Sequence, residues 1–147
     1  MISGTAFSLF DGIDAESLLS REEEFGFEII DYIDLDGGFG RGIACTSSSD
    51  DVYMKRWGLE RFQARYSPHG IETIWGWNHE ASGILPCSIY LRHVYLAAKS
   101  MGPEMLKSLL DETYLVDRKT TIRQYLENNP DVLETSPPES LLHRYNG

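Results

Sequence analysis

Two strand-like segments separated by a short glycine turn constrain the fold of this chain more than any other feature. Residues 25–35 alternate as a strand does and are largely apolar on both faces, which predicts a central strand of a sheet. Asp36-Gly37-Gly38 is a hairpin signal, and residues 39–46 are predicted to return as the antiparallel partner. The sequence therefore predicts a β-hairpin over residues 25–46.

The glycines of residues 37–42 do not form a phosphate-binding loop, because such a loop lies between a strand and a helix. Asp34-Leu35-Asp36-Gly37 departs from a calcium loop, because its glycine comes too early and Cys45 stands where a bidentate glutamate is needed. His79-Glu80 is not followed by a second histidine at helical spacing, which excludes the zinc peptidase motif. We therefore expect no metal and no cofactor.

The N-terminal residues predict a strand followed by a helix that ends in acids. Residues 2–9 alternate and are rich in β-formers, and Asp11-Gly12 marks a turn. Asp14 is predicted to cap a helix over residues 15–24, which ends in the run Glu22-Glu23-Glu24. An acid held between a strand and a helix end is partly desolvated, which raises its pKa and suits it to proton transfer. Helix phase decides whether Glu22 points inward or whether Glu23 takes its place.

The rest of the chain is predicted to be mainly helical. Hydrophobic periodicity and capping residues predict helices over residues 51–66, 88–100, 103–113 and 117–126, with a strand over residues 71–77. The arginines of the first of these helices are interpreted as a solvated face. Three prolines and few apolar residues predict that residues 129–147 form an extended tail, which leaves one domain over residues 1–128.

Composition and charge exclude several classes of partner and location. The 147 residues include 13 basic and 23 acidic ones, and the formal charge of -10 repels both nucleic acid and anionic membrane surfaces. No apolar run approaches the roughly 18 residues of a membrane span, and the N-terminus lacks a signal peptide. Two widely spaced cysteines indicate neither a disulfide framework nor a thiolate metal site. These features predict an acidic cytoplasmic protein.

Two blocks of sequence resemble the γ-glutamylcyclotransferase superfamily. Gly4-Thr5-Ala6-Phe7, followed by Leu18-x-x-Arg21-Glu22 and then by Phe25, is similar to a G-x-A/V-Φ strand that leads into a helix ending L-D-x-R/Q-E. Residues 78–80 and the segment Tyr90–Gly102 are similar to the family's N-x-E turn and its Y-x-x-x-x-x-x-G/A-A-K-x-x-G helix. The blocks occur in the family's order and cover about half of the chain.

This resemblance implies a fold, an activity and a general acid/base. The implied fold is α+β, with a small mixed or antiparallel sheet or partial barrel of the γ-glutamylcyclotransferase type and C-terminal helices. The implied reaction converts glutathione or another γ-glutamyl amine or peptide to 5-oxoproline without a cofactor. The family's acid falls on Glu22, which would be the catalytic residue. Arg21, Arg41 and Tyr90 are candidates for binding the substrate carboxylate, because arginine and tyrosine donate hydrogen bonds to carboxylates.

Two departures from the family pattern keep an alternative open. Leu19 stands at the aspartate of the helix-end motif, and the family's first strand and glycine loop have no counterpart ahead of Gly4. A sheet edge would then be filled by the helix around residues 57–66 or by a second subunit in a homodimer, unless the chain is a partial product. The alternative is a noncatalytic relative that acts as a binding or assembly module through an exposed cluster of Trp57, Trp75 and Trp77.

Overall fold

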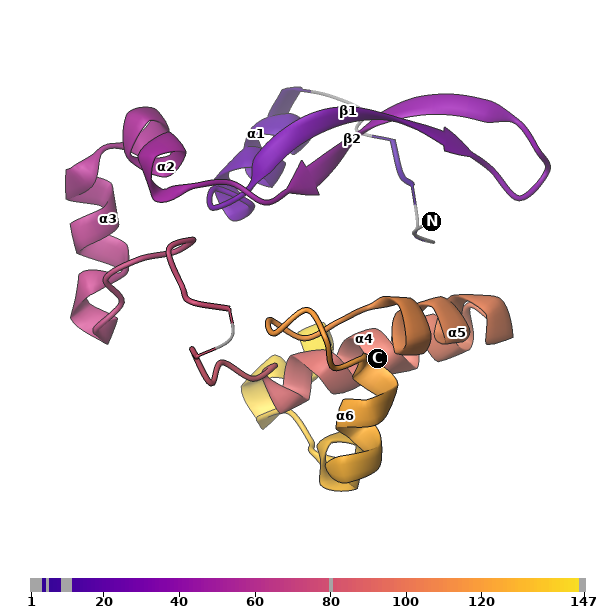
Figure 1. The fold of residues 1–147 in the computed structure, drawn as a ribbon. Helices are drawn as coiled ribbons and strands as arrows, with labels where there is room; N and C mark the ends of the chain where they lie inside the picture. The colour runs from indigo at the N-terminus through magenta and orange to yellow at the C-terminus, as the bar shows by residue number, and fades with distance from the viewer. Residues whose placement is uncertain (1–3, 5, 9–11, 80, 146–147) are drawn as a thin grey trace. The chain divides into compact units, whose positions relative to one another are not determined.

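The computed structural model describes residues 4, 6–8, 12–79 and 81–145. The chain forms two compact units, one of residues 6–77 and the other of the residues from 78 onward together with Gly4. We call residues 6–77 the N-terminal unit and the residues from 78 onward the C-terminal unit. The fold is mixed α+β, with helices in both units and a small antiparallel sheet in the N-terminal unit (Figure 1).

The N-terminal unit contains three α-helices, one short 3-10 helix and a hairpin among its described residues. In chain order these elements are α1 (Gly12–Arg21), β1 (Gly26–Ile33), β2 (Phe39–Thr46), α2 (Asp50–Trp57), α3 (Leu59–Arg65) and η1 (Ser67–His69). Tyr53 of α2 and Phe62 of α3 are 2% and 5% exposed, and their rings meet edge to face at a centroid distance of 6.2 Å. This aromatic contact forms the apolar centre of the unit.

The predicted hairpin is confirmed. Strands β1 and β2 pair antiparallel, with Gly26 opposite Thr46 and Ile33 opposite Phe39. In the turn, Asp34 accepts backbone hydrogen bonds from Asp36 and Gly38 on one carboxylate oxygen, at 2.9 and 2.7 Å. Gly37 takes a φ of 84°, which glycine adopts without strain. The described residues add no third strand to this sheet, so the prediction of a central strand over residues 25–35 was wrong.

Other elements of the N-terminal unit differ from the sequence predictions. In the segment predicted as the first strand, Gly4 and residues 6–8 are not in a strand, and the other positions lie outside the described residues. Helix α1 begins at Gly12, so Asp14 lies inside the helix and not at its cap, and the helix ends at Arg21. Residues 71–77 form an irregular loop in place of the predicted strand.

The helix predicted over residues 51–66 is interrupted at Gly58. This glycine has a φ of 85° and separates α2 from α3. Ser49 caps α2 by accepting a hydrogen bond from the backbone N–H of Val52 at 3.3 Å. A φ of this sign is accessible to glycine and strained for other residues, so a single glycine turns the chain between the two helices.

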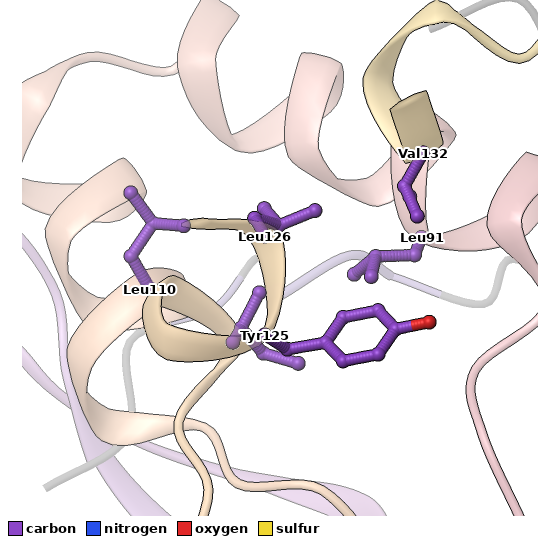
Figure 2. Packing of buried hydrophobic residues seen from close by; sticks show 6 residues of the cluster. Leu91, Leu110, Tyr125, Leu126 and Val132 are labelled. Carbon is purple, nitrogen blue, oxygen red and sulfur yellow. The ribbon is translucent and has the colours of Figure 1, made fainter. Parts of the chain in front are cut away.

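The C-terminal unit contains six helical elements among its described residues. Its elements are α4 (Ser88–Ser100), α5 (Pro103–Glu112), α6 (Ile122–Asn128), η2 (Pro130–Glu134), η3 (Glu139–Leu141) and α7 (Leu142–Tyr145). The buried core, shown in Figure 2, consists of Leu91, Leu110, Ile122, Tyr125, Leu126 and Val132. None of the helices that the structure describes has the length and apolar character needed to cross a bilayer.

Two features of the C-terminal unit depart from the predictions. Helix α6 begins at Ile122 behind a capping box of Thr121 and Gln124, whereas Asp117 caps the preceding turn through the backbone N–H groups of Lys119 and Thr120. The segment expected to be an extended tail instead forms η2, η3 and α7, and its Val132 is 3% exposed. The hydrophobic core of this unit therefore continues beyond residue 128.

Candidate functional site

The acidic turn after α1 positions three consecutive glutamates differently. The turn is closed by hydrogen bonds from the N–H of Glu22 to the carbonyl of Leu18 at 2.9 Å and from the N–H of Phe25 to the carbonyl of Glu22 at 3.1 Å. Glu23 is 1% exposed, whereas Glu22 and Glu24 are half-buried. The turn therefore directs Glu23 inward, and the sequence had left open whether Glu22 or Glu23 takes this place.

Four side chains from α2, α3 and the residue after α3 surround the Glu23 carboxylate. Oε1 accepts hydrogen bonds from the hydroxyls of Tyr53 at 2.7 Å and Tyr66 at 3.3 Å. Oε2 accepts from Nε of Arg61 at 2.9 Å and lies 2.9 Å from Nη1 of Arg65. We call these five residues the Glu23 anchor.

The Glu23 anchor holds its carboxylate ionised. Burial by itself would raise the pKa of Glu23, but the hydrogen bonds from Arg61 and Tyr53 and the charges of Arg65 and Arg61 outweigh it, so this pKa lies below its ordinary value. Burial and the contact with Glu23 raise the pKa of Tyr53. Since both oxygens of Glu23 are occupied and its proton affinity is lowered, this glutamate is suited to hold structure and not to accept a proton.

The backbone of the same turn is held by two indoles and a guanidinium. Nε1 of Trp57 donates to the carbonyl of Glu23 at 3.1 Å, and Nε1 of Trp75 donates to the carbonyl of Glu24 at 2.7 Å. Nη1 of Arg56 donates to the carbonyl of Phe25 at 3.1 Å. These donors satisfy carbonyl groups that a chain leaving a helix exposes, and they fix the backbone at the acidic turn.

Glu22 is the glutamate of this turn that pairs with a neighbour on its own helix end. Its side chain is 28% exposed, and Oε1 lies 3.0 Å from Nε of Arg21. The charge of Glu22, after burial, raises the pKa of the Cys45 thiol, and Arg21 opposes it. Cys45 itself lies in β2 and is exposed.

The three carboxylate-binding candidates have different surroundings. Arg21 contacts Glu22, as described above. Arg41 lies in β2, with Nε 3.2 Å from Oδ1 of Asp31 across the hairpin, and both side chains are exposed. Tyr90 belongs to α4 in the C-terminal unit, where its ring meets that of Tyr145 edge to face at 6.3 Å. Of the three, Arg21 is the residue that the described contacts join to Glu22.

The sequence interpretation missed the residues that bind the acidic turn. Arg61 and Arg65 were assigned to a solvated face, yet both reach Glu23 from one side of α3. Their spacing of four residues, which puts them on the same helix face, was the available signal. Trp57 and Trp75 direct their indole N–H groups to the turn, so their polar groups are not part of an exposed aromatic cluster.

The residues that the structure describes contain no group of three or more histidine, cysteine, aspartate or glutamate side chains placed to hold a metal ion. No protein-family model, no curated protein and no solved structure matches this chain.

Proposed function

We propose that this chain is a γ-glutamylcyclotransferase-like enzyme in which Glu22 is the general acid/base. The observation that carries the proposal is the division of roles in the acidic turn. Glu23 is buried and fully bonded, while Glu22, one residue earlier, is partly exposed and attached to the same fixed backbone. A proton-transfer carboxylate needs a defined position and access to the substrate, and Glu22 is held by Arg21 and is partly exposed.

The sequence resemblance supports the same residue. Helix α1 ends at Arg21 and Glu22 follows directly, in the manner of the family's helix-end motif. The second similar block, Tyr90–Gly102, begins within α4, and Gly102 follows that helix with a φ of 109°. The helical parts of the two blocks lie in or next to α1 and α4, whereas Gly4 and residues 6–8, from the strand part of the first block, are not in a strand.

The proposed reaction requires little from the protein besides positioning. The α-amine of a γ-glutamyl group attacks its own γ-carbonyl carbon, a five-membered ring closes, and the bond to the leaving amine breaks. Glu22 takes the proton from the attacking amine and returns it to the leaving amine, so charge and atoms balance without a cofactor. Holding the γ-glutamyl chain folded supplies much of the acceleration through proximity.

Arg21 is the candidate for contact with the substrate carboxylate that lies beside the proposed base. Its Nε is engaged by Glu22 at 3.0 Å, and its side chain is 57% exposed. A guanidinium has five N–H donors, so Arg21 can hold Glu22 with one and still offer others to a carboxylate. Arg41, which lies in the same unit as Glu22, remains a secondary candidate on this proposal.

Release of 5-oxoproline tests the proposal. The purified chain is offered glutathione and a panel of γ-glutamyl amino acids, and Glu22→Gln is expected to abolish release while the thermal unfolding curve stays unchanged. Glu16→Gln, an exposed acid in α1, is the matched control and is expected to keep full turnover. Full turnover by Glu22→Gln would refute the assigned base, and no release from the folded wild type would refute catalysis.

A noncatalytic assembly module is the second candidate. The observation that favours it is a row of exposed apolar side chains on the hairpin, which includes Ile29, Ile33 and Phe39 at 68%, 64% and 86% exposure. Soluble monomers seldom expose contiguous apolar surface, and such patches mark sites of interaction. A folded protein that releases no 5-oxoproline but associates through this surface would support the assembly module.

A further inference from the structure

One face of the β1–β2 hairpin is apolar around a central pair of opposite charges. The register places Ile33 opposite Phe39, Asp31 opposite Arg41, and Ile29 opposite Ile43, and these side chains share one face because each pair is two residues from the next. Ile43 is 69% exposed, similar to the apolar residues named above. We call these six residues the hairpin face.

The opposite face of the same hairpin is different. The ring of Tyr32 lies over Gly40 and Gly42, so a side chain of the hairpin itself covers that face, and Tyr32 and Ile30 are only 38% and 43% exposed. Glu28 adds an acid to that side. The hairpin face is therefore the side of the sheet that requires a covering surface, since a two-stranded hairpin is marginally stable in water unless an apolar face is packed.

We infer that the hairpin face binds the same face of a second copy of this chain. Charge complementarity selects this occupant. The chain as a whole carries a formal charge of -10, which opposes self-association over most of its surface. The hairpin face carries one aspartate and one arginine, 3.2 Å apart, and is neutral. This is a surface on which two copies can meet without net repulsion.

A two-fold axis parallel to the strands satisfies both the charges and the apolar residues. It lays β1 of one copy over β2 of the other, so Asp31 faces the partner's Arg41 and Arg41 faces the partner's Asp31. The isoleucine pair on one side of the charges and the Ile33–Phe39 pair on the other then each pack on the same pair of the second copy. Such an interface is isologous, and aligned sheets pack in this way at a spacing of about 10 Å.

The size of the hairpin face sets the expected strength. The six residues of the hairpin face lie within five consecutive residues of each strand, so the face is about 16 Å long and about 10 Å wide. This area is well below the roughly 800 Å² per partner of a standard specific interface, which predicts a weak dimer with a dissociation constant in the upper micromolar range. The inference does not depend on whether the chain turns over a γ-glutamyl compound, because association is measured without substrate.

The test is the mass of the full-length chain by sedimentation from about 1 μM to about 500 μM, a range that brackets a micromolar dimer. The wild type is expected to convert from monomer to dimer. Asp31→Lys and Arg41→Glu each leave two like charges on the face, and each variant alone is expected to bind itself at least about tenfold more weakly.

Mixing the two variants separates contact between copies from pairing within one chain. In the mixed dimer Lys faces Glu and Arg41 faces the partner's Asp31, so a one-to-one complex is expected to regain the wild-type dissociation constant. A wild type that stays monomeric at the highest concentration would overturn the inference, whatever the variants do. Single variants that dimerise like the wild type, or a mixture that gives no heterodimer from folded variants, would also overturn it. A wild type that associates only with another protein would assign the face to a different occupant.

Discussion

Arg61 donates two hydrogen bonds to one oxygen of Glu23, although 38 residues separate them in the chain. The glutamate follows α1 and the arginine lies in α3, so this pair ties the end of the first helix to the third. Arg61 also lies over the ring of Trp57 at 4.5 Å from the centroid, and Trp57 in turn donates to the backbone of Glu23. One guanidinium thus links the carboxylate and the indole that hold the acidic turn.

Glu23→Gln is expected to destabilise the N-terminal unit by about 3 kcal/mol, because it leaves the arginines of the anchor without their buried counter-charge. Trp57, Trp75 and Trp77 are the three tryptophans of the chain and all belong to this unit, so tryptophan fluorescence in urea reports its unfolding. Glu16→Gln is the control and should unfold like the wild type. An unchanged midpoint for Glu23→Gln would mean that the anchor contributes nothing to stability.

The stabilisation from Glu23 is expected to depend on pH. Its folded-state pKa is lower than the ordinary value of 4.5, so its contribution is fully present above that value and is lost as the pH falls through the folded-state pKa. The tyrosines of the anchor have raised pKa values and stay neutral in this range, and its arginines stay charged. The difference in free energy of unfolding between the wild type and Glu23→Gln should therefore shrink below about pH 4.5. A difference that stays constant under acid conditions would contradict the role of the Glu23 charge.

Gly40→Ala is expected to displace the Tyr32 ring and to cost about 1 kcal/mol, because a Cβ at this position would overlap the ring. Gly42→Ala is the matched control on the same strand and face, since its Cβ would lie 3.7 Å from Tyr32, an ordinary contact. The measurements are the free energy of unfolding and the ring resonances of Tyr32. In a Tyr32→Ala background, Gly40→Ala should no longer lower the free energy of unfolding. A loss of stability that persists would show that the backbone, and not the Tyr32 ring, is the cause.

Val132→Ala is expected to destabilise the C-terminal unit by about 2 kcal/mol, because two buried methyl groups are lost from its core. Leu142→Ala is the control, since Leu142 is 41% exposed in the same C-terminal segment. Far-UV circular dichroism during thermal unfolding measures both variants. Equal, small effects of the two substitutions would indicate that residues beyond 128 do not contribute to the core.

Sequence patterns correctly predicted the elements whose structure depends on residues close to one another in the chain. The hairpin of residues 25–46, the helix over residues 88–100 and the restart at Pro103 were all predicted, and each depends on periodicity, turn residues or caps within a few positions. The predictions failed where contacts between residues distant in the chain determine the structure. Residues 71–77 have strand-like composition, but the backbone N–H groups of Ile74 and Trp75 bind Asp50 at 2.9 and 2.8 Å in place of a neighbouring strand.

The candidate site was found in part from the sequence. The acidic run after α1 was identified as the candidate catalytic region, and Glu22 as its proposed base. Neither the resemblance nor the residue pattern predicted which glutamate is buried. That choice depends on Tyr53 and Arg61, whose side chains reach Glu23 from 30 and 38 residues away. Sequence spacing puts Arg61 and Arg65 on one face of a helix, but it does not show what that face contacts.

The sequence by itself determined the hairpin and helices α4 and α5, because hydrogen bonds and steric preferences between residues close in the chain specify them. Only the tertiary structure decided that Glu23 is the buried anchor, that Glu22 remains partly accessible, and that the C-terminal segment contributes Val132 to a core. The physical reason is burial. The environment of a carboxylate or a valine is set by side chains that folding brings together from distant positions, and local propensity carries no information on those partners.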